Sequence, residues 1–255
     1  MRKVTSLLLV MSLVSGVAFA SEGAGGGESW RGWHADTDIN SKASLQRGAR
    51  NFVNYCLGCH SLQYVRYNRI AEDLEITEEQ LKSSLMFTGE RPFDYVLSAM
   101  PAADAETWFG RAPPDLSLTA RAKGTDYLYQ FLQTFYLDDS RPTGVNNLAL
   151  ENPAMPHVLA ELQGLRKAVF VLEKHSEAGQ EKMLRKFDHF EPVAPGRLSE
   201  TEYAAFVGDL VNFLDYVSEP ARLQREQLGI WVVLFLIVFT LLAWSLKKEI
   251  WKDVH

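Results

Sequence analysis

The feature that most constrains this chain is an uncharged stretch close to its C-terminus. The nineteen residues 228–246, LGIWVVLFLIVFTLLAWSL, contain no charged side chain. At about 1.5 Å per residue, a helix of this length rises roughly 28 Å, close to the hydrocarbon thickness of a bilayer. Trp231 and Trp244 lie near its ends, where indole rings favour the membrane interface. A buried core helix is the alternative, but core helices are seldom apolar on every side, so we predict a membrane anchor over residues 226–247.

The first twenty residues have the pattern of a secretory signal peptide. Arg2 and Lys3 precede a short apolar run, and the segment ends in Ala18-Phe19-Ala20, with small residues where a signal peptidase reads. The run is short for a span, which argues against an uncleaved anchor. Because Lys248 and its neighbours follow the C-terminal span, and basic residues stay cytoplasmic, we predict a periplasmic domain over residues 21–225, an inner-membrane anchor and a cytoplasmic tail over residues 248–255.

The charge of the chain limits its partners. The formal net charge is -6, and because the signal peptide carries Arg2 and Lys3 and no acidic residue, the remainder carries -8. A chain this acidic is a poor match for nucleic acid, whose phosphates attract basic surfaces. Electrostatic steering favours a basic protein partner instead.

The only two cysteines of the chain stand in the sequence Cys56-Leu57-Gly58-Cys59-His60. C-x-x-C-H is the attachment signature of a c-type haem, in which both thiols bond to the porphyrin and the histidine ligates the iron. A thioredoxin-type redox pair requires a βαβ setting, whereas the residues before Cys56 have helical periodicity. A two-residue gap makes a poor disulfide staple, and a zinc site needs more ligands. We predict one covalently attached haem c, with His60 as an axial ligand of its iron.

The second axial ligand has three candidates. A methionine thioether raises the potential of a haem and suits electron transfer. Met100 and Met155 both occur in the tripeptide Ala-Met-Pro, 40 and 95 residues after His60. Met155 lies in Asn152-Pro153-Ala154-Met155-Pro156, which cannot form regular helix. His157 is the third candidate, and local chemistry favours Met155 without excluding the other two.

The remaining pattern predicts an all-α domain with long loops around the haem. Residues 41–60 form the first helix, and residues 158–190 have helical character, with leucines spaced for one face. Ser199 to Glu202 match a capping box, which opens an amphipathic helix that ends at Pro220. No strand pattern is convincing.

Taken together, these segments resemble the cytochrome c1 family, the haem c subunits of cytochrome bc1 complexes. The resemblance rests on four stretches: Arg47-Gly48 through Tyr55 into CLGCHSLQYVRYNRI; Ala112-Pro113-Pro114-Asp115-Leu116-Ser117; Arg141-Pro142-Thr143-Gly144-Val145 with Asn152 to Pro156; and an amphipathic helix, Glu219-Pro220, one span and a basic tail.

The resemblance implies a class I cytochrome c-like haem domain with inserted segments. It places the haem on Cys56 and Cys59, with His60 and Met155 as the axial ligands. It also implies an electron-transfer subunit of quinol–cytochrome c reductase, which takes electrons from the Rieske iron–sulfur protein and passes them to a soluble or tethered cytochrome c. Quinol oxidation would occur on other subunits, and the span would contact cytochrome b and membrane lipid.

Three other functions remain to be tested. A free-standing anchored electron carrier, or a haem c subunit that feeds a terminal oxidase, would use the same ligands. A haem peroxidase would need an open or labile sixth position at the iron. A haem-based gas sensor would usually carry an output domain, whereas only a short tail follows the span here.

Overall fold

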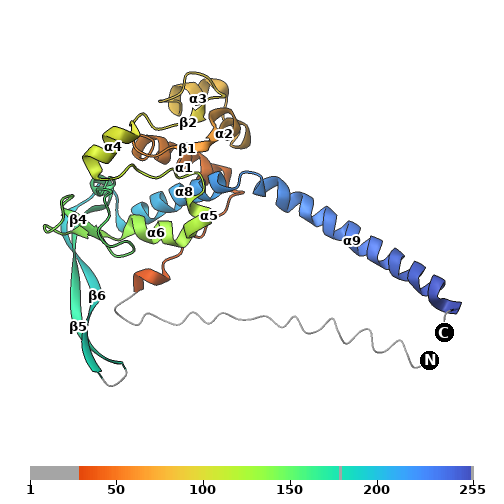
Figure 1. Ribbon diagram of the computed structural model, residues 1–255. Helices are drawn as coiled ribbons and strands as arrows, with labels where there is room; N and C mark the ends of the chain where they lie inside the picture. Colours follow the sequence, from red (N-terminus) through yellow and green to blue (C-terminus); the bar gives the residue numbers. More distant parts are fainter. Residues whose placement is uncertain (1–28, 178–179, 254–255) are drawn as a thin grey trace.

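The computed structural model describes residues 29–177 and 180–253, so the predicted signal peptide, residues 1–20, lies outside the described part of the chain. Figure 1 shows a body built mainly of helices. A long β-hairpin and one long helix project from this body in different directions.

Two crossing helices form the centre of the body. α1 (Lys42–Tyr55) packs against α8 (Glu200–Ser218), and the Phe52 and Phe213 rings meet with their centroids 5.8 Å apart. Gly48 lies at the crossing, where a Cβ atom would come 2.1 Å from the Asp209 carbonyl oxygen. Only glycine therefore allows the two helix backbones to approach this closely.

The predicted start of α8 is confirmed. The Ser199 side chain accepts a hydrogen bond from the backbone of Glu202, whose carboxylate accepts one from the backbone of Ser199, so the capping box is complete. The predicted apolar stripe is buried along most of this helix, and the helix ends two residues before Pro220.

Shorter helices surround this pair: η1 (Ser29–Gly32), α2 (Tyr67–Asp73), α3 (Glu78–Ser84), α4 (Ala102–Phe109), α5 (Thr119–Lys123), α6 (Thr125–Gln133) and α7 (Ala160–Gln163). Of these, α2, α3, α5, α6 and α7 share one hydrophobic core with α1 and α8, to which α6 contributes the buried Leu128 and Leu132.

The expectation of an all-α class was too narrow, because the described residues also form three antiparallel strand pairs. β1 (Leu62–Arg66) pairs with β2 (Tyr95–Val96), β3 (Phe135–Leu137) with β4 (Val145–Asn147), and β5 (Gly164–Glu177) with β6 (Gln180–Pro195). The last pair is the hairpin that leaves the body in Figure 1.

The prediction of helix over residues 158–190 was wrong beyond Gln163. α7 stops because Gly164 has a φ of +89°, and a Cβ atom there would lie 2.5 Å from the Ala194 carbonyl oxygen. Farther on, Phe170 and Phe187 are cross-strand partners whose rings meet edge to face with centroids 6.1 Å apart. Aromatic cross-strand contacts of this kind stabilise a hairpin, and they outweigh the leucine spacing that indicated helix.

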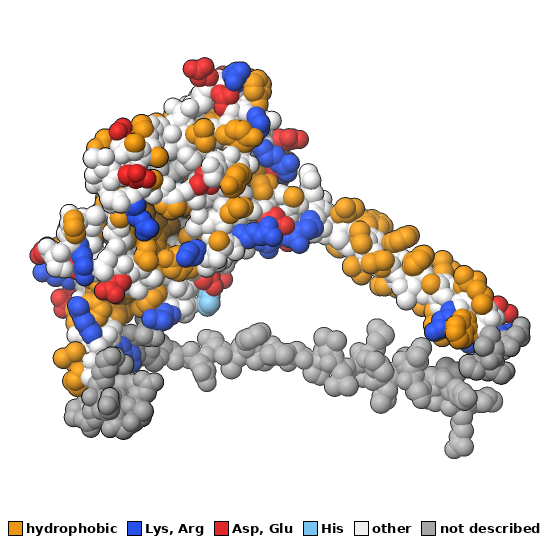
Figure 2. All heavy atoms as spheres, in the orientation of Figure 1, with side chains coloured by type: hydrophobic (Ala, Val, Ile, Leu, Met, Phe, Trp, Pro, Cys, Tyr) orange, Lys and Arg blue, Asp and Glu red, His pale blue; other side chains and the backbone are white. Residues whose placement is uncertain are grey.

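The predicted span forms one continuous helix, α9 (Arg222–Ile250), followed by η2 (Trp251–Asp253). Its segment Gln224–Ile250 contains an 18-residue window with a mean hydropathy of 2.5, and no residue of that window is buried against the rest of the chain. Figure 2 shows hydrophobic side chains along this helix and Lys and Arg side chains near its two ends. A long apolar helix that the protein itself leaves uncovered fits a transmembrane helix.

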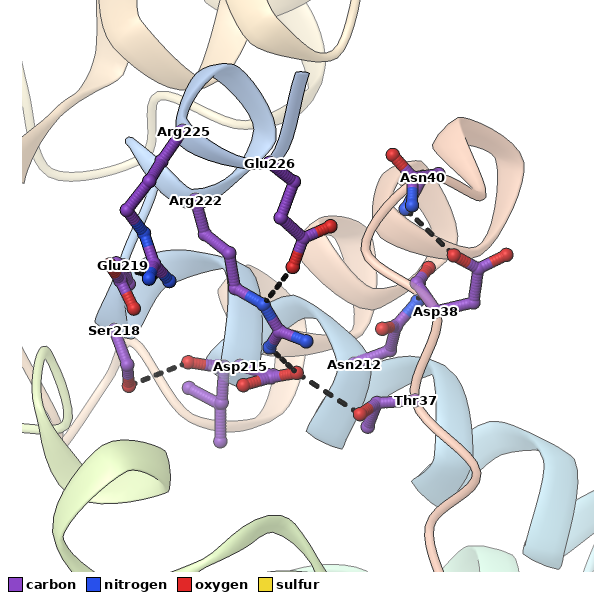
Figure 3. A network of polar contacts seen from close by, with 11 residues as sticks. Thr37, Asp38, Asn40, Asn212, Asp215, Ser218, Glu219, Arg222, Arg225 and Glu226 are labelled. Atoms are coloured by element: carbon purple, nitrogen blue, oxygen red, sulfur yellow. Dashed lines mark hydrogen bonds and ion pairs between the residues drawn. The ribbon is translucent and has the colours of Figure 1, made fainter. Parts of the chain in front are cut away.

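Polar contacts join α9 to the body at the turn between α8 and α9 (Figure 3). The Arg222 guanidinium forms an ion pair with Asp215 of α8 at 3.3 Å and donates to Glu226 one turn later at 2.8 Å. Thr37, in the segment that precedes α1, donates to the same Asp215 carboxylate at 3.0 Å. These contacts connect the N-terminal segment, α8 and the start of α9 at one point.

Candidate haem-attachment site

The C-x-x-C-H segment forms a tight turn at the end of α1. The Cys56 amide still donates to the Phe52 carbonyl at 2.8 Å, and the amides of Cys59 and His60 both donate to the Cys56 carbonyl, at 3.0 and 2.8 Å. The α1–α8 crossing positions the helix end, and Leu57 is buried in the core. The two cysteines and the histidine are therefore held by local backbone hydrogen bonds.

The two cysteine thiols are free in this structure. Cys56 packs against the hydrophobic core, and burial raises the pKa of its thiol to about 12. A redox-active C-x-x-C pair needs a thiol with a lowered pKa, so this environment does not favour thioredoxin-type chemistry. A zinc site is also unsupported, because the described residues contain no group of three or more His, Cys, Asp or Glu that can hold a metal ion.

His60 is oriented by the segment Pro113 to Ser117. Its Nδ1 atom lies 2.8 Å from the Pro114 carbonyl oxygen, which can only accept, so Nδ1 carries the proton and Nε2 keeps a free lone pair for a metal. Burial lowers the pKa of His60, which also favours the neutral imidazole that metals bind. The Leu116 amide donates a hydrogen bond to the Ser61 carbonyl at 2.9 Å, so this segment is held against the turn formed by the C-x-x-C-H residues, which we call the attachment turn.

Met155 lies in an irregular loop, and its side chain is partly buried against the core. The loop is held from β4, where the buried Asn146 side chain accepts hydrogen bonds from the amides of Asn147 and Asn152, both at 2.9 Å. Asn152 has a φ of +59°, a left-handed conformation that asparagine tolerates better than most residues. The sequence analysis missed the role of Asn146, although an Asn-Asn pair shortly after the turn at Gly144 is a recognisable signal.

The other two ligand candidates have different surroundings. Met100 precedes α4, and its amide donates to the Ser98 hydroxyl at 3.1 Å. Ser98 in turn donates its hydroxyl to the Gly58 carbonyl at 2.8 Å, so Met100 is tied to the attachment turn itself. The His157 ring stacks on the Phe135 ring, with centroids 4.8 Å apart and an interplanar angle of 4°.

These parts fit a covalently bound haem. The structure holds two free cysteines in the turn after α1, a histidine whose Nε2 is free for a metal, and a methionine that packs against the same core from an irregular loop. This combination of groups characterises the c-type cytochromes.

The comparisons with known proteins give the family. The model of the Cytochrome C1 family matches residues 33–254. A cytochrome c1 from Allochromatium vinosum is 48% identical over 91% of this chain and 92% of the relative. The cytochrome c1 of Rhodospirillum rubrum is 28% identical over 89% of this chain and 86% of the relative. A protein named ammonia monooxygenase gamma subunit, from Nitrosomonas europaea, is 42% identical over the full length of both chains.

This chain belongs to the cytochrome c1 family. It is thus related to the haem-bearing, membrane-anchored subunits of the cytochrome bc1 complex, which act in the electron transport of respiratory chains. The predicted membership in this family is confirmed.

Proposed function

We propose that this chain carries one haem c, attached through Cys56 and Cys59, with His60 and Met155 as the axial ligands of the iron. In this role it takes single electrons from the Rieske iron–sulfur protein and passes them to a soluble or tethered cytochrome c. It acts as a subunit of quinol–cytochrome c reductase, in which quinol oxidation occurs on other subunits. The haem supplies the reversible one-electron couple. The observation that carries the proposal is the His60–Pro114 hydrogen bond, which leaves Nε2 free for iron in the turn after α1 that bears both cysteines.

The ligand set suits electron transfer rather than turnover of oxygen or peroxide. With His60 and Met155 as its two protein ligands, the iron would have no coordination position open for a small molecule. A thioether ligand would raise the potential, and the apolar core against which Met155 and Cys56 pack would favour the reduced state further. This argues against the peroxidase and gas-sensor alternatives.

The contacts of Met100 and Met155 support Met155 as the second ligand. Two ligands of the same iron would have to come from separate parts of the chain. Met100 is joined through Ser98 to Gly58, within the turn that bears His60. Met155 reaches the core from a separate loop, held by Asn146 on β4. This separation favours Met155 as the residue that would hold the iron together with His60.

The arrangement in the membrane follows from the two ends of the chain. We propose that residues 1–20 are a cleaved signal peptide, that residues 21–225 form the haem domain in the periplasm and that residues 226–247 span the inner membrane. Residues 248–255 then form a cytoplasmic tail. Small residues on α9, among them Gly229 and Ala243, allow close contact with helices of cytochrome b, and membrane lipid covers the rest.

Purification of the intact assembly tests this function. The full-length protein, tagged at its C-terminus and extracted in a mild detergent, is expected to co-purify with b-type haem and a Rieske iron–sulfur signal. The preparation should also show quinol:cytochrome c reductase activity. Isolation of the haem c protein alone, or together with a terminal oxidase, would instead establish the anchored-carrier alternative.

A second function has one specific observation in its favour, the full-length similarity to the protein named ammonia monooxygenase gamma subunit. The same purification distinguishes it, because co-purification with a monooxygenase and absence of b-type haem would assign the chain to that assembly. The family model and the cytochrome c1 relatives favour the reductase.

A further inference from the structure

Two side chains of the segment Pro113 to Ser117 bind the backbone of β1. The Gln63 amide donates to Asp115 Oδ2 at 2.8 Å, and the next amide, that of Tyr64, donates to Ser117 Oγ at 3.2 Å. The partners are 52 and 53 positions apart in the sequence, so these are tertiary contacts. The segment is therefore held at two successive residues of β1, which begins directly after the attachment turn.

The half-buried Asp115 carboxylate uses both of its oxygens on backbone amides. Oδ2 accepts from Gln63, and Oδ1 accepts from the Ser117 amide at 2.9 Å. No lysine or arginine among the described residues forms an ion pair with this carboxylate. Asp94 is a useful contrast, because it also accepts from two backbone amides but pairs with Arg91 at 3.3 Å. The negative charge of Asp115 is thus not offset by a basic partner.

Asp115 acts on His60 both through the backbone and through its charge. Pro114, whose carbonyl accepts from His60 Nδ1 at 2.8 Å, is the residue directly before Asp115, so the bonds that hold Asp115 also hold this carbonyl in place. Burial lowers the pKa of His60, whereas the Pro114 carbonyl and the Asp115 carboxylate both act in the opposite direction. Groups behind a metal-binding histidine fix the orientation of its ring and raise its basicity.

We propose that Asp115 is a positioning residue for His60 and that its negative charge lowers the midpoint potential of the haem. This inference rests on the proposed ligation of the iron by His60. The hydrogen bonds of Asp115 keep the Pro114 carbonyl against His60 Nδ1, so the imidazole keeps one orientation. The ferric state carries one more positive charge than the ferrous state, so a nearby carboxylate stabilises it. Asp115 therefore opposes Met155, whose thioether raises the potential.

A purely structural role of this segment is the alternative, and Ser117 separates it from the role of the charge. Ser117 is fully buried and uncharged, and its hydroxyl holds the neighbouring Tyr64 amide. Ser117→Ala removes one of the two side-chain contacts with β1 and changes no charge. Asp115→Asn keeps the shape of the side chain and one accepting oxygen, and it removes the charge. The two variants thus form a matched pair.

Redox titration of the full-length protein in detergent measures the effect of the charge. In Asp115→Asn we expect the ratio of ferrous to ferric haem at a fixed applied potential to rise by about fivefold, the order of magnitude for one charge in a water-screened setting. Asp115→Glu keeps the charge and should titrate close to the unmodified protein. Ser117→Ala should also titrate close to the unmodified protein. The same result is expected for the control Asp94→Asn, in which the lost charge is one that Arg91 offsets.

Hydrogen–deuterium exchange measures the positioning contacts without reference to the iron. The amides of Gln63 and Tyr64 donate to Asp115 and Ser117, so the peptide that contains these amides should exchange faster in both Asp115→Asn and Ser117→Ala. Only Asp115→Asn should combine faster exchange with a raised potential. This combination distinguishes a charge that acts on His60 from a general loosening of the segment.

The outcomes separate this inference from the proposed function. An unchanged potential in Asp115→Asn, or an equal rise in Ser117→Ala, would overturn the role of the charge. Unchanged exchange in Asp115→Asn would overturn the positioning role. If Asp115→Asn incorporates no haem, normal haem content in Asp115→Glu supports the inference, and an equal loss contradicts it. A normal low-spin haem in His60→Ala would instead overturn ligation by His60, and with it the basis of the inference.

Discussion

The two sides of the candidate haem pocket are built in different ways. On the His60 side, both cysteines and the histidine lie within five consecutive residues at the end of α1, and the turn is closed by hydrogen bonds of 2.8 and 3.0 Å within that segment. On the Met155 side, the proposed ligand comes 95 residues later, from a loop that contains no regular element. That loop is held by Asn146 at one end and by the His157–Phe135 stack at the other.

This difference shows that the two proposed iron ligands, His60 and Met155, are held by different kinds of interaction. The His60 side depends on a helix end, which local sequence specifies. The Met155 side depends on side chains from β3, β4 and α7, which only the folded chain brings together. Damage to the tertiary structure should therefore release the methionine before it disturbs the attachment turn. The predictions below test this contrast, from the largest expected effect to the smallest.

The largest effect is expected for His60→Ala. Loss of the imidazole removes the ligand that Pro114 orients, so stable incorporation of a low-spin haem should be abolished. The optical spectrum and covalent haem content of isolated membranes measure this loss. The exposed His189 provides the control, because His189→Ala should retain the normal spectrum. A normal low-spin spectrum from His60→Ala would contradict the assignment.

The second effect concerns the methionine side alone. Met155→Leu should keep the covalently attached haem but lower its midpoint potential by at least ~0.1 V, because axial ligands shift haem potentials over a wide range. Redox titration of the purified protein measures the change, and Met100→Leu serves as the matched control with an unchanged potential. An unchanged potential in Met155→Leu would return Met100 or His157 to consideration.

The third effect tests the helix crossing that supports the attachment turn. In Gly48→Ala the new Cβ atom would lie 2.1 Å from the Asp209 carbonyl oxygen and 2.6 Å from Phe213 Cβ. Such overpacking should lower the free energy of unfolding by about 3 kcal/mol. Gly208 on α8 provides the control, since a Cβ atom there meets no atom within 4 Å. Gly208→Ala should be neutral or stabilising by up to about 1 kcal/mol in thermal or denaturant unfolding. Equal stability of the two variants would contradict a tight crossing.

The smallest effect is a pH dependence on the methionine side. Hydrogen bonds from Ser140 and Asn146 lower the pKa of Asp138 to about 2, and Asn146 also holds the Met155 loop. Because the folded pKa lies below the unfolded value, Asp138 stabilises the protein above about pH 4 and loses this effect as the pH falls toward 2.

Asp138→Asn should therefore be less stable than the unmodified protein at pH 7, by at most about 1 kcal/mol, and the difference should shrink in acid. Thermal unfolding at a series of pH values measures this difference. A stability difference between the two proteins that stays constant down to pH 2 would show that the ionised Asp138 carboxylate does not stabilise the fold.

The accuracy of the sequence reasoning varied with the range of the interactions concerned. The capping box at Ser199, the apolar stripe of α8 and the uninterrupted α9 were predicted correctly, because each depends on residues within a few turns. The hairpin over residues 164–195 was missed, because its strands are stabilised by contacts across the pair, such as Phe170 with Phe187. Leucine spacing within one segment carries no information about such partners.

The sequence by itself determined the attachment turn, the family and the membrane helix, because each is recognised from a short run of neighbouring residues. Tertiary structure alone decided what surrounds the proposed iron ligands. Pro114 lies 54 residues from His60, and Asn146 meets Asn152 across a turn that follows β4. The physical reason is that hydrogen-bond partners and buried polar atoms are selected by distance in space, and this distance exists only once the helices have packed.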